Sequence, residues 1–288
     1  MILENISKIY VRTLKSIPER TEWIEKEMSR VGIENYTLYY NVEKTDKLLD
    51  QWKDEGKIKL GPECFQCGEL KCHCRAKVLT RGMVANFISS YLVWKEIVEN
   101  DEPDSSVYII MEDDVYFQDN AADALAAIFT RDFIETMPKE PTLLKLGWGD
   151  MLDYRKTHFE VPPGKHMFKK GSDKFSNPCY AGNKLFFKYL VDNFEKIESA
   201  CDMWVHRRMA PLVETFEIHP AICKELSHVG TIKSAMHKKY SQPNNHLRDY
   251  KLSGGDRKYI DKFIESEKEY FDYWFNYWED EWDLKLYE

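Results

Sequence analysis

Several features that define other classes of protein are scarce or missing in this chain. It contains no run of about eighteen apolar residues, which a membrane-spanning helix would need. The opening MILENISKIYVRTLKSIPER has no basic segment followed by a long apolar segment and a small-residue cleavage site. We therefore expect no membrane span and no secretion signal, and a cytoplasmic location.

Clustered positive charge is also missing. The chain has 41 Lys and Arg against 49 Asp and Glu, a formal net charge of -8, and it contains no long basic block. Nucleic-acid binding normally needs a clustered positive surface, because the phosphate backbone is uniformly negative. The composition therefore argues against a nucleic-acid partner, and its acidic balance mainly favours solubility.

The residues that are present suit a globular fold in which strands and helices alternate. The chain has 288 residues, 43% hydrophobic and 14% aromatic, enough for the core of one large or two modest domains. β-Branched and aromatic runs predict strands at residues 8–14, 36–41, 107–111 and 142–150. Apolar residues at helical spacing predict helices at residues 18–32, 83–100, 121–129 and 183–197. This alternation predicts an α/β fold with a mainly parallel sheet flanked by helices.

The composition changes after residue 240. SQPNNHLRDYKLSGGDR is typical of a linker, and the remaining residues predict a long, acidic, aromatic helix. We therefore divide the chain into a main domain at 1–240 and a helical extension at 241–288. One side of this helix would carry Tyr259, Phe263, Tyr270, Trp274, Tyr277 and Trp278. The helix could fold back onto the main domain or offer a surface for a partner or for homo-oligomer formation, and its acidity disfavours membrane docking.

A Cys-rich insertion is expected at about residues 55–78. The chain has an odd number of cysteines, 7, and four of them lie in CFQCGELKCHC with C-x2-C-x4-C-x-C spacing. This spacing is close enough for one structural Zn2+ in a reduced compartment, with disulfides and unpaired thiols as alternatives. The thiolates would be those of Cys64, Cys67, Cys72 and Cys74.

Three adjacent carboxyl groups follow an apolar strand in SVYIIMEDDVYF, at Glu112, Asp113 and Asp114. Ligands of open α/β sheets bind beyond the carboxyl ends of the strands, where the loops converge. Adjacent carboxylates repel one another unless a cation neutralises them, and their hard oxygens suit Mg2+ or Mn2+. The triplet therefore favours a divalent-cation site that bridges the protein to a diphosphate. A solvated surface turn is the alternative.

The triplet and the segment before it resemble a known enzyme family. VYIIMEDD resembles the acidic motif of GT-A glycosyltransferases, and LTRGMVANFISSYLVW resembles a segment of glycosyltransferase family 25, the lipooligosaccharide and procollagen galactosyltransferase group. The residues that match the family pattern in register are Leu79, Thr80, Gly82, Ser89 and Trp94. The family's Glu, Gly, Cys and His are replaced here by Met83, Ala85, Asn86 and Ser90. The likeness covers roughly residues 9–232.

The resemblance implies a GT-A-like, Rossmann-type fold and an inverting transfer of galactose or glucose from a UDP-sugar to a hydroxyl of a glycan or glycoprotein. The reaction would depend on Mn2+ or Mg2+, which would stabilise the leaving diphosphate while the sugar passes through an oxocarbenium-like state. Asp114 would be the main metal ligand, Glu112 would support it, and Asp113 would contact the ribose or the metal. The resemblance also implies donor contacts at Arg12, Thr13, Arg20, Arg81, Tyr180 and Ala181.

A loop near the end of the similar region offers further ligands. His228 lies in ELSHVGTIKS, in a setting similar to the late histidine that many GT-A enzymes use as another metal ligand. Lys233 on the same loop would contact the diphosphate. A loop histidine held by hydrogen bonds is the alternative for His228.

The base that deprotonates the acceptor hydroxyl would be a carboxylate. Asp202, in CDMWVHRRM, matches a D-x-W-like segment in the family's later half, and Asp150, in LGWGD, is the second candidate. An Asp before an apolar helical run is also an ordinary N-cap, which is the alternative for Asp202.

Two other functions could use the same features. A metal-dependent phosphoesterase would activate water with the carboxylates. It would need further Asp/His clusters to bind a second ion, and the sequence shows none. A non-catalytic module that binds glycans or proteins could keep the fold, and Ser90 in place of the family's His motivates that alternative.

Overall fold

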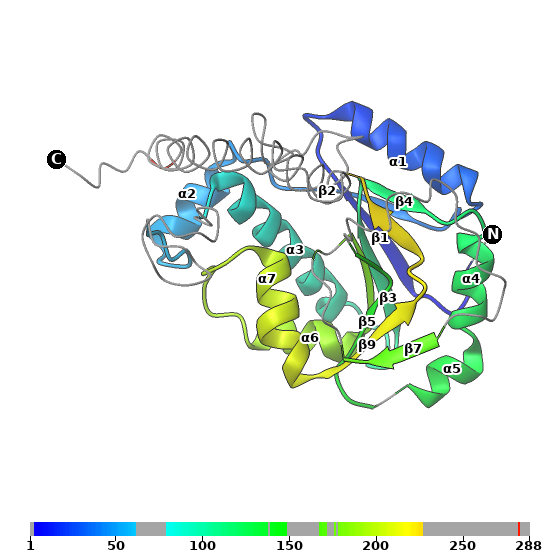
Figure 1. The fold of residues 1–288 in the computed structure, drawn as a ribbon. Coiled ribbons are helices and arrows are strands. Elements are labelled where there is room, and N and C mark those ends of the chain that lie inside the picture. The colour runs from blue at the N-terminus through cyan, green and yellow to red at the C-terminus, as the bar shows by residue number, and fades with distance from the viewer. Residues whose placement is uncertain are drawn as a thin grey trace, which may run out of the picture.

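The computed structural model describes residues 3–61, 79–137, 139–148, 167–171, 176, 178–226 and 282. A seven-stranded sheet runs through the middle, with helices on both of its faces (Figure 1). Its strands are β1 (Lys8–Thr13), β2 (Thr37–Tyr40), β3 (Val107–Glu112), β5 (Thr142–Lys145), β7 (Met167–Lys170), β8 (Cys179–Asn183) and β9 (Glu214–His219). A three-stranded sheet is built from β4 (Val115–Phe117), β6 (Gly147–Trp148) and β10 (Cys223–Glu225).

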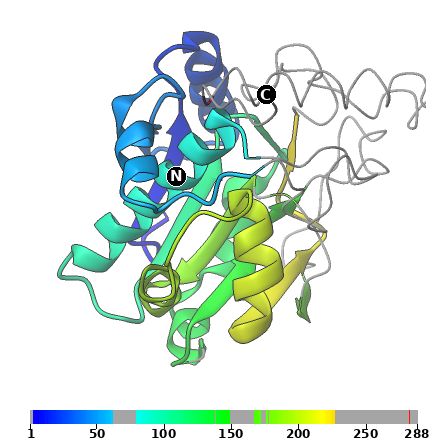
Figure 2. The same cartoon turned by 90° about the vertical axis from the view of Figure 1, so that its left-hand side faces the viewer.

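Two groups of helices cover the large sheet. One face carries α1 (Pro18–Arg30), α4 (Ala121–Ile128) and α5 (Arg131–Thr136). The other face, turned toward the viewer in Figure 2, carries α2 (Lys47–Asp54), α3 (Arg81–Glu99), α6 (Lys184–Asp192) and α7 (Cys201–Met203). Helix α7 continues as a π-helical segment (Trp204–Met209) and a 3-10 turn (Ala210–Leu212). In the described part of the chain, no helix combines the length and the apolar character needed to cross a membrane.

The strand order of the large sheet is β2-β1-β3-β8-β5-β9-β7. Strand β1 pairs in parallel with both β2 and β3, and β5 pairs in parallel with β9. Strands β8 and β7 run antiparallel to their neighbours. The sheet is therefore mostly parallel, as predicted, and the carboxyl ends of β1, β3, β5 and β9 lie along one edge of it.

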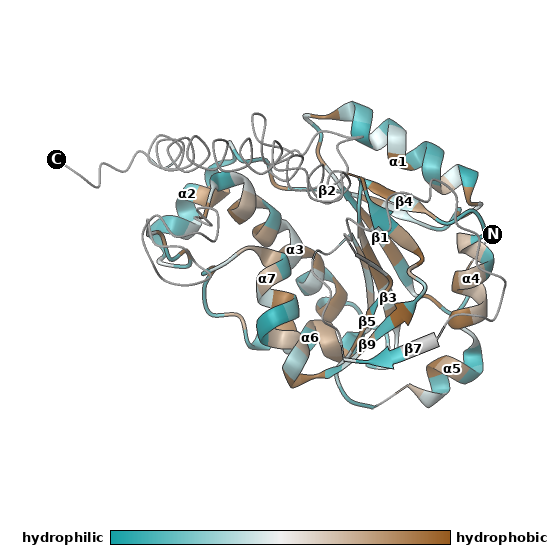
Figure 3. Ribbon diagram, in the orientation of Figure 1, coloured by the Kyte–Doolittle hydropathy of each residue, from teal (hydrophilic) through white to brown (hydrophobic). Residues whose placement is uncertain are grey.

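Helices cover both faces of the sheet, which explains why β3 is apolar and buried from Val107 to Met111. Figure 3 shows brown, hydrophobic segments in the central sheet, with teal where the strands carry polar residues. Alternate residues of β1 and β3 enter two separate cores. The core under α1 and α4, here the α1-side core, contains Ile9, Val11, Ile109 and Met111. The core under α3 and α6, here the α3-side core, contains Tyr10, Tyr108 and Ile110.

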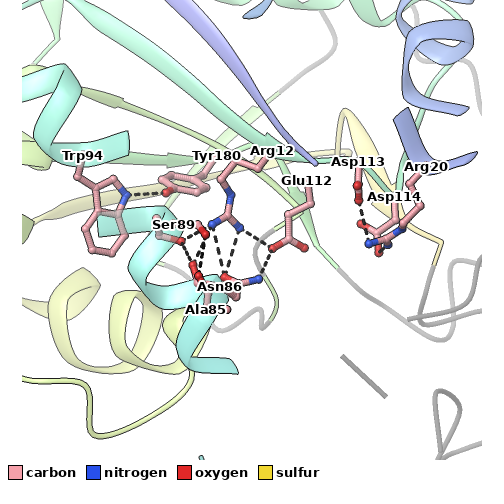
Figure 4. Close-up of polar contacts among 11 residues, drawn as sticks. Arg12, Arg20, Ala85, Asn86, Ser89, Trp94, Glu112, Asp113, Asp114 and Tyr180 are labelled. Carbon is pink, nitrogen blue, oxygen red and sulfur yellow. Dashed lines mark hydrogen bonds and ion pairs between the residues drawn. The ribbon is translucent and has the colours of Figure 1, made fainter. Parts of the chain in front are cut away.

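Helix α3 is fixed by its cap and by its apolar stripe. Thr80 is the N-cap, and its Oγ1 accepts a hydrogen bond from the Met83 backbone N–H (3.2 Å). Phe87 and Trp94 are fully buried, as their helical spacing predicts. Trp94 Nε1 donates to the Tyr180 hydroxyl on β8 (3.0 Å). These contacts place the first turns of α3 beside the carboxyl ends of β1 and β3 (Figure 4).

Helix α1 is tied to β4 by one buried carboxylate. The helix begins at Pro18, a residue suited to the first helical turn. Glu27 is 3% exposed; its carboxylate accepts a hydrogen bond from the Phe117 backbone N–H (2.7 Å) and two from the Arg30 guanidinium. This link holds the helix in place, and with it Arg20 on its first turns.

The structure confirms most of the predicted elements and corrects two of them. The predicted strand at 142–150 is wrong as a single element, because β5 ends at Lys145 and β6 begins at Gly147 in the smaller sheet. Gly147 permits this, since a Cβ there would collide with Cys223 Sγ on β10. The predicted helix at 183–197 ends at Asp192. The division at residue 240 stays a prediction, because the structure describes one residue of the extension, Trp282.

Removing the Glu27 carboxylate should strongly destabilise the fold. Glu27→Ala leaves a buried backbone N–H without its acceptor and Arg30 without its partner, so we expect a loss of about 3 kcal/mol in the free energy of unfolding in urea. Glu27→Gln keeps an acceptor and should lose less. The exposed i,i+4 pair of Arg131 and Glu135 is the control, and Glu135→Ala should leave the free energy of unfolding nearly unchanged. Equal losses in the two alanine variants would contradict the role of Glu27.

Candidate functional site

A cavity opens at the carboxyl ends of β1 and β3. Its volume is about 360 Å3. Its charged lining residues are Arg12, Arg20, Glu43, Lys44, Glu112, Asp113, Asp114 and Glu225. The rest of its wall comes from the loop between β1 and α1, the loop after β2 and the first turns of α3. This is the edge at which an open parallel sheet presents its ligands.

Arg12 and Glu112 form the inner pair of the site. They are register partners on the parallel strands β1 and β3, and their side chains meet at 2.8 Å. Arg12 also donates to Ser90 Oγ and to the Asn86 carbonyl and side chain, both on α3 (Figure 4). The Arg12 side chain is 2% exposed and that of Glu112 is 24% exposed. The arginine is therefore held rigidly, and Glu112 reaches the cavity.

Arg20 forms the outer pair with two carboxylates at once. Its guanidinium contacts Asp113 Oδ1 at 2.9 Å and Asp114 Oδ2 at 2.8 Å. Both aspartates are 3% exposed and lie in the turn between β3 and β4. Figure 4 shows Arg20 reaching them from α1, on the opposite side of Glu112 from Arg12. Each aspartate keeps one buried oxygen, Asp113 Oδ2 and Asp114 Oδ1, without a hydrogen-bond partner among the residues described.

A third acidic side chain approaches from a distant part of the sequence. Glu225 ends β10, which pairs antiparallel with β4, so that Glu225 lies opposite Val115. The Leu226 backbone N–H then donates to the Asp114 carbonyl (2.8 Å). One carboxylate oxygen from each of Glu112, Asp114 and Glu225 lies within 4.8 Å of the others. This three-carboxylate group is the part of the site best suited to a cation.

The pKa values of the carboxyl groups reflect their burial. Burial raises the pKa of Glu112 from 4.5 to about 7; Arg12 opposes this rise, and the neighbouring Asp114 and Asp113 add to it. Burial likewise raises the pKa of Asp113 from 3.8 to about 6, with Arg20 opposing. The arginines therefore compensate only part of the cost of ionising these groups.

The site fits a divalent cation in charge and in donor type. When ionised, Glu112, Asp113, Asp114 and Glu225 carry four negative charges, and Arg12 and Arg20 supply two positive ones. A divalent ion would balance the remainder. The buried Asp114 Oδ1, which lacks a hydrogen-bond partner within the described ranges, is a ready oxygen ligand. Carboxylate oxygens are what Mg2+ and Mn2+ prefer.

The structure brings together five of the residues predicted from sequence. Arg12, Arg20, Glu112, Asp113 and Asp114 all line the cavity. The predicted alternative for the triplet, a solvated turn, does not describe these residues, because both aspartates are buried and paired.

Four other predicted donor contacts lie away from the cavity wall. Thr13 is buried behind it and shares a hydrogen bond with the Thr21 hydroxyl (3.0 Å). Arg81 points to Asp50 and the loop after β2. Tyr180 and Ala181 are inside the sheet, because β8 is the antiparallel strand between β3 and β5 and both of its faces are covered.

Asp202 lies in the first turn of α7, outside the cavity lining. It is not the helix N-cap that sequence offers as its alternative role, because Ala200 occupies that position. Its neighbour Cys201 is buried close enough to Ser90 and Arg12 to interact with both. Helix α7 thus approaches the site from the side of the inner pair, and the role of Asp202 as a base stays a prediction.

Several predicted residues lie outside the described residues. These are Asp150, His228 and Lys233, and the four predicted zinc ligands Cys64, Cys67, Cys72 and Cys74. Among the described cysteines, Cys179, Cys201 and Cys223 are buried free thiols.

Sequence reasoning missed three contributors. Glu225 lies three residues before the predicted ligand His228, but nothing in CKELSH shows that a short strand brings the glutamate back to the triplet. Asn86 and Ser90 stand where the family has Cys and His, and here they hold Arg12. Their spacing of four residues on a helix could have indicated one shared partner.

The raised pKa of Glu112 predicts a pH-dependent stability. Between 4.5 and about 7 the folded state keeps a proton that the unfolded state releases, so stability falls as the pH rises through this window and levels off above it. Glu112→Gln cannot titrate. Without divalent cations, urea unfolding should show the wild type losing stability relative to Glu112→Gln across this window. A difference that stays constant with pH would contradict the burial of this carboxyl group.

Comparison with known proteins agrees with the geometry. The family model described as glycosyltransferase family 25 (LPS biosynthesis protein) matches residues 6–197, two thirds of the chain. No individually curated protein matches the sequence. The matched residues run from β1 through α6 and include Arg12, Arg20 and the acidic triplet. The chain belongs to glycosyltransferase family 25, and it is a glycosyltransferase.

Proposed function

We propose that this glycosyltransferase transfers galactose or glucose from a UDP-sugar to a hydroxyl of a glycan or glycoprotein, with a divalent cation and inversion at the anomeric carbon. The observation that carries the proposal is the convergence of three carboxylates on a cavity that two arginines also line. One carboxylate oxygen from each of Glu112, Asp114 and Glu225 lies within 4.8 Å of the others. Family membership favours this transfer over both the phosphoesterase and the non-catalytic alternatives.

The residues that would hold the cation are Glu112, Asp114 and Glu225. When bound, Mn2+ or Mg2+ would supply Lewis-acid stabilisation of the leaving diphosphate. The protein's own part is to orient these carboxylates toward one another. Arg12 orients Glu112, and the backbone contact from Leu226 to Asp114 holds the ends of β10 and β3 together.

Arg20 is the guanidinium best placed for the donor's diphosphate. It enters the cavity from the first turns of α1, where the helix dipole also favours negative charge. Its two aspartate partners keep it from turning toward solvent. A planar fork with several donors suits phosphate oxygens better than an ammonium would.

The nucleoside would lie along the loop after β2. This loop supplies Asn41, Val42, Glu43, Lys44 and Thr45 to the wall of the same cavity, at the edge of the parallel sheet. In Rossmann-type folds the crevice beyond the carboxyl ends of adjacent parallel strands receives the nucleotide. The sugar would then reach toward the inner pair, and Asp202 or Asp150 would take the proton from the acceptor hydroxyl.

Binding of cation and nucleotide should be coupled through the three carboxylates. By calorimetry, Mn2+ should strengthen UDP binding to the wild type, because the ion joins the protein to the diphosphate. Asp114→Asn and Glu225→Gln should each weaken Mn2+ binding about tenfold or more, since each removes one charged ligand. Asp119→Asn and Glu214→Gln are matched controls, because these acidic residues pair with Arg30 and Lys170 elsewhere.

Two results would overturn this part of the proposal. One is a wild type that binds UDP equally well with and without Mn2+. The other is Mn2+ binding that falls as much in the control variants as in Asp114→Asn.

Donor choice can be read from hydrolysis without knowing the acceptor. We expect slow release of UDP from UDP-galactose or UDP-glucose in the presence of Mn2+, because water can replace the acceptor hydroxyl. Release should stop on chelation and in Asp114→Asn. GDP- and CDP-sugars are the comparison donors. Preferred turnover of one of them would replace UDP in the proposal, and failure with every donor would remove its catalytic part.

A further inference from the structure

Trp282 is a buried residue that contacts Leu79 and Arg81, which lie far from it along the chain. It is 2% exposed and belongs to the α3-side core. Its Nε1 donates a hydrogen bond to the carbonyl of Leu79 (2.8 Å), just before helix α3 begins. A tryptophan buried with its N–H satisfied is a strong anchor, because it combines a large apolar surface with a directed hydrogen bond.

The ring of Trp282 supports Arg81. The guanidinium carbon of Arg81 lies 5.0 Å from the ring centroid, within the range of a cation-π contact. The same guanidinium donates to the Lys44 carbonyl (2.8 Å) and to Asp50 Oδ1 (2.6 Å). Arg81 thus joins Trp282, the start of α3, the loop after β2 and helix α2.

These contacts hold the loop at residues 41–46 in position. Its residues 41–45 form part of the cavity wall. One end is fixed by the Val42 backbone N–H, which donates to Ser89 Oγ (2.9 Å). At the other end the Arg81 guanidinium holds the Lys44 carbonyl and also reaches the Asp46 carbonyl (3.4 Å). The position of this wall therefore depends on where Arg81 is held.

We propose that Trp282 is a positioning residue of the donor site, acting through Arg81 on the loop at 41–46. Trp282 does not line the cavity, so its effect on a ligand must pass through the residues it supports. Without the ring, Arg81 would regain rotamer freedom and solvent, and the loop would lose its fixed carbonyl contacts. The nature of the ligand rests on the proposed function, whereas the mechanical coupling does not.

A double-mutant cycle tests this coupling. With Mn2+ present, Trp282→Ala and Arg81→Ala should each weaken UDP binding by about fivefold to tenfold, and the double variant should bind no worse than Arg81→Ala. Trp282→Phe keeps an aromatic ring under Arg81 and should recover part of the affinity. Mn2+ binding measured alone should be unchanged, because the carboxylates lie on other elements.

Ile128→Ala controls for a general loss of stability. Ile128 is buried in the α1-side core, on the opposite face of the sheet from Trp282. It should lower the melting temperature as Trp282→Ala does, but leave UDP affinity unchanged. The loss of stability in Ile128→Ala should also add to the loss in Arg81→Ala, since the two sites share no partner.

Amide hydrogen exchange tests the coupling without any ligand, so its result does not depend on which donor the protein binds. In the ligand-free protein, Trp282→Ala should speed exchange at the Val42 and Asp46 amides, which are hydrogen-bonded in the wild type, and Ile128→Ala should not. If the wild type binds no UDP but exchange changes in this way, the proposed donor fails and the coupling stands. Unchanged exchange, or additive effects of Trp282→Ala and Arg81→Ala, would overturn the coupling.

Discussion

The clustering of four carboxylates, three of them buried, with two buried guanidinium groups at the end of β3 is the constraint on which this site depends. Charges removed from water are costly unless partners of opposite sign reach them at close range. The register of β1 and β3 supplies one partner, Arg12, directly beside Glu112. Helix α1 supplies the other, Arg20, to both Asp113 and Asp114. Two negative charges remain when all four acids ionise. Burial raises the pKa values of Glu112 and Asp113, and the neighbouring carboxylates add to this rise.

The rest of the fold can be understood as what holds these charges in place. Glu27 ties α1 to β4 and so fixes the direction from which Arg20 enters. The hydrogen bond from Trp94 to Tyr180 holds α3 against the sheet, so that the first turns of α3 can accept hydrogen bonds from Arg12. Strand β10 pairs with β4 and carries Glu225 back to the turn that follows β3. Each contact joins segments distant in sequence, as expected when a site is assembled at the edge of a parallel sheet.

Local patterns predicted much of this arrangement, and long-range pairing accounts for the rest. The apolar strand that stops at Glu112 and the helical stripe of Phe87 and Trp94 are local signals, and the structure confirms both. To predict which residues contact the triplet, one would have to know the strand order and the register of the sheet. Arg81 illustrates the difference, because a family likeness placed it at the donor and the structure turns it to Asp50. Glu225 had no local signal, since its position follows from a three-residue strand in a second sheet.

The most direct test of the account is the location of a bound metal ion. Crystals of the protein grown with Mn2+ and UDP can be measured at a wavelength where manganese scatters anomalously. We expect one strong anomalous peak within coordination distance of oxygens from Glu112, Asp114 and Glu225, with the diphosphate on its open side. A peak away from these carboxylates, or nucleotide bound in the cavity with no peak beside it, would contradict the central claim.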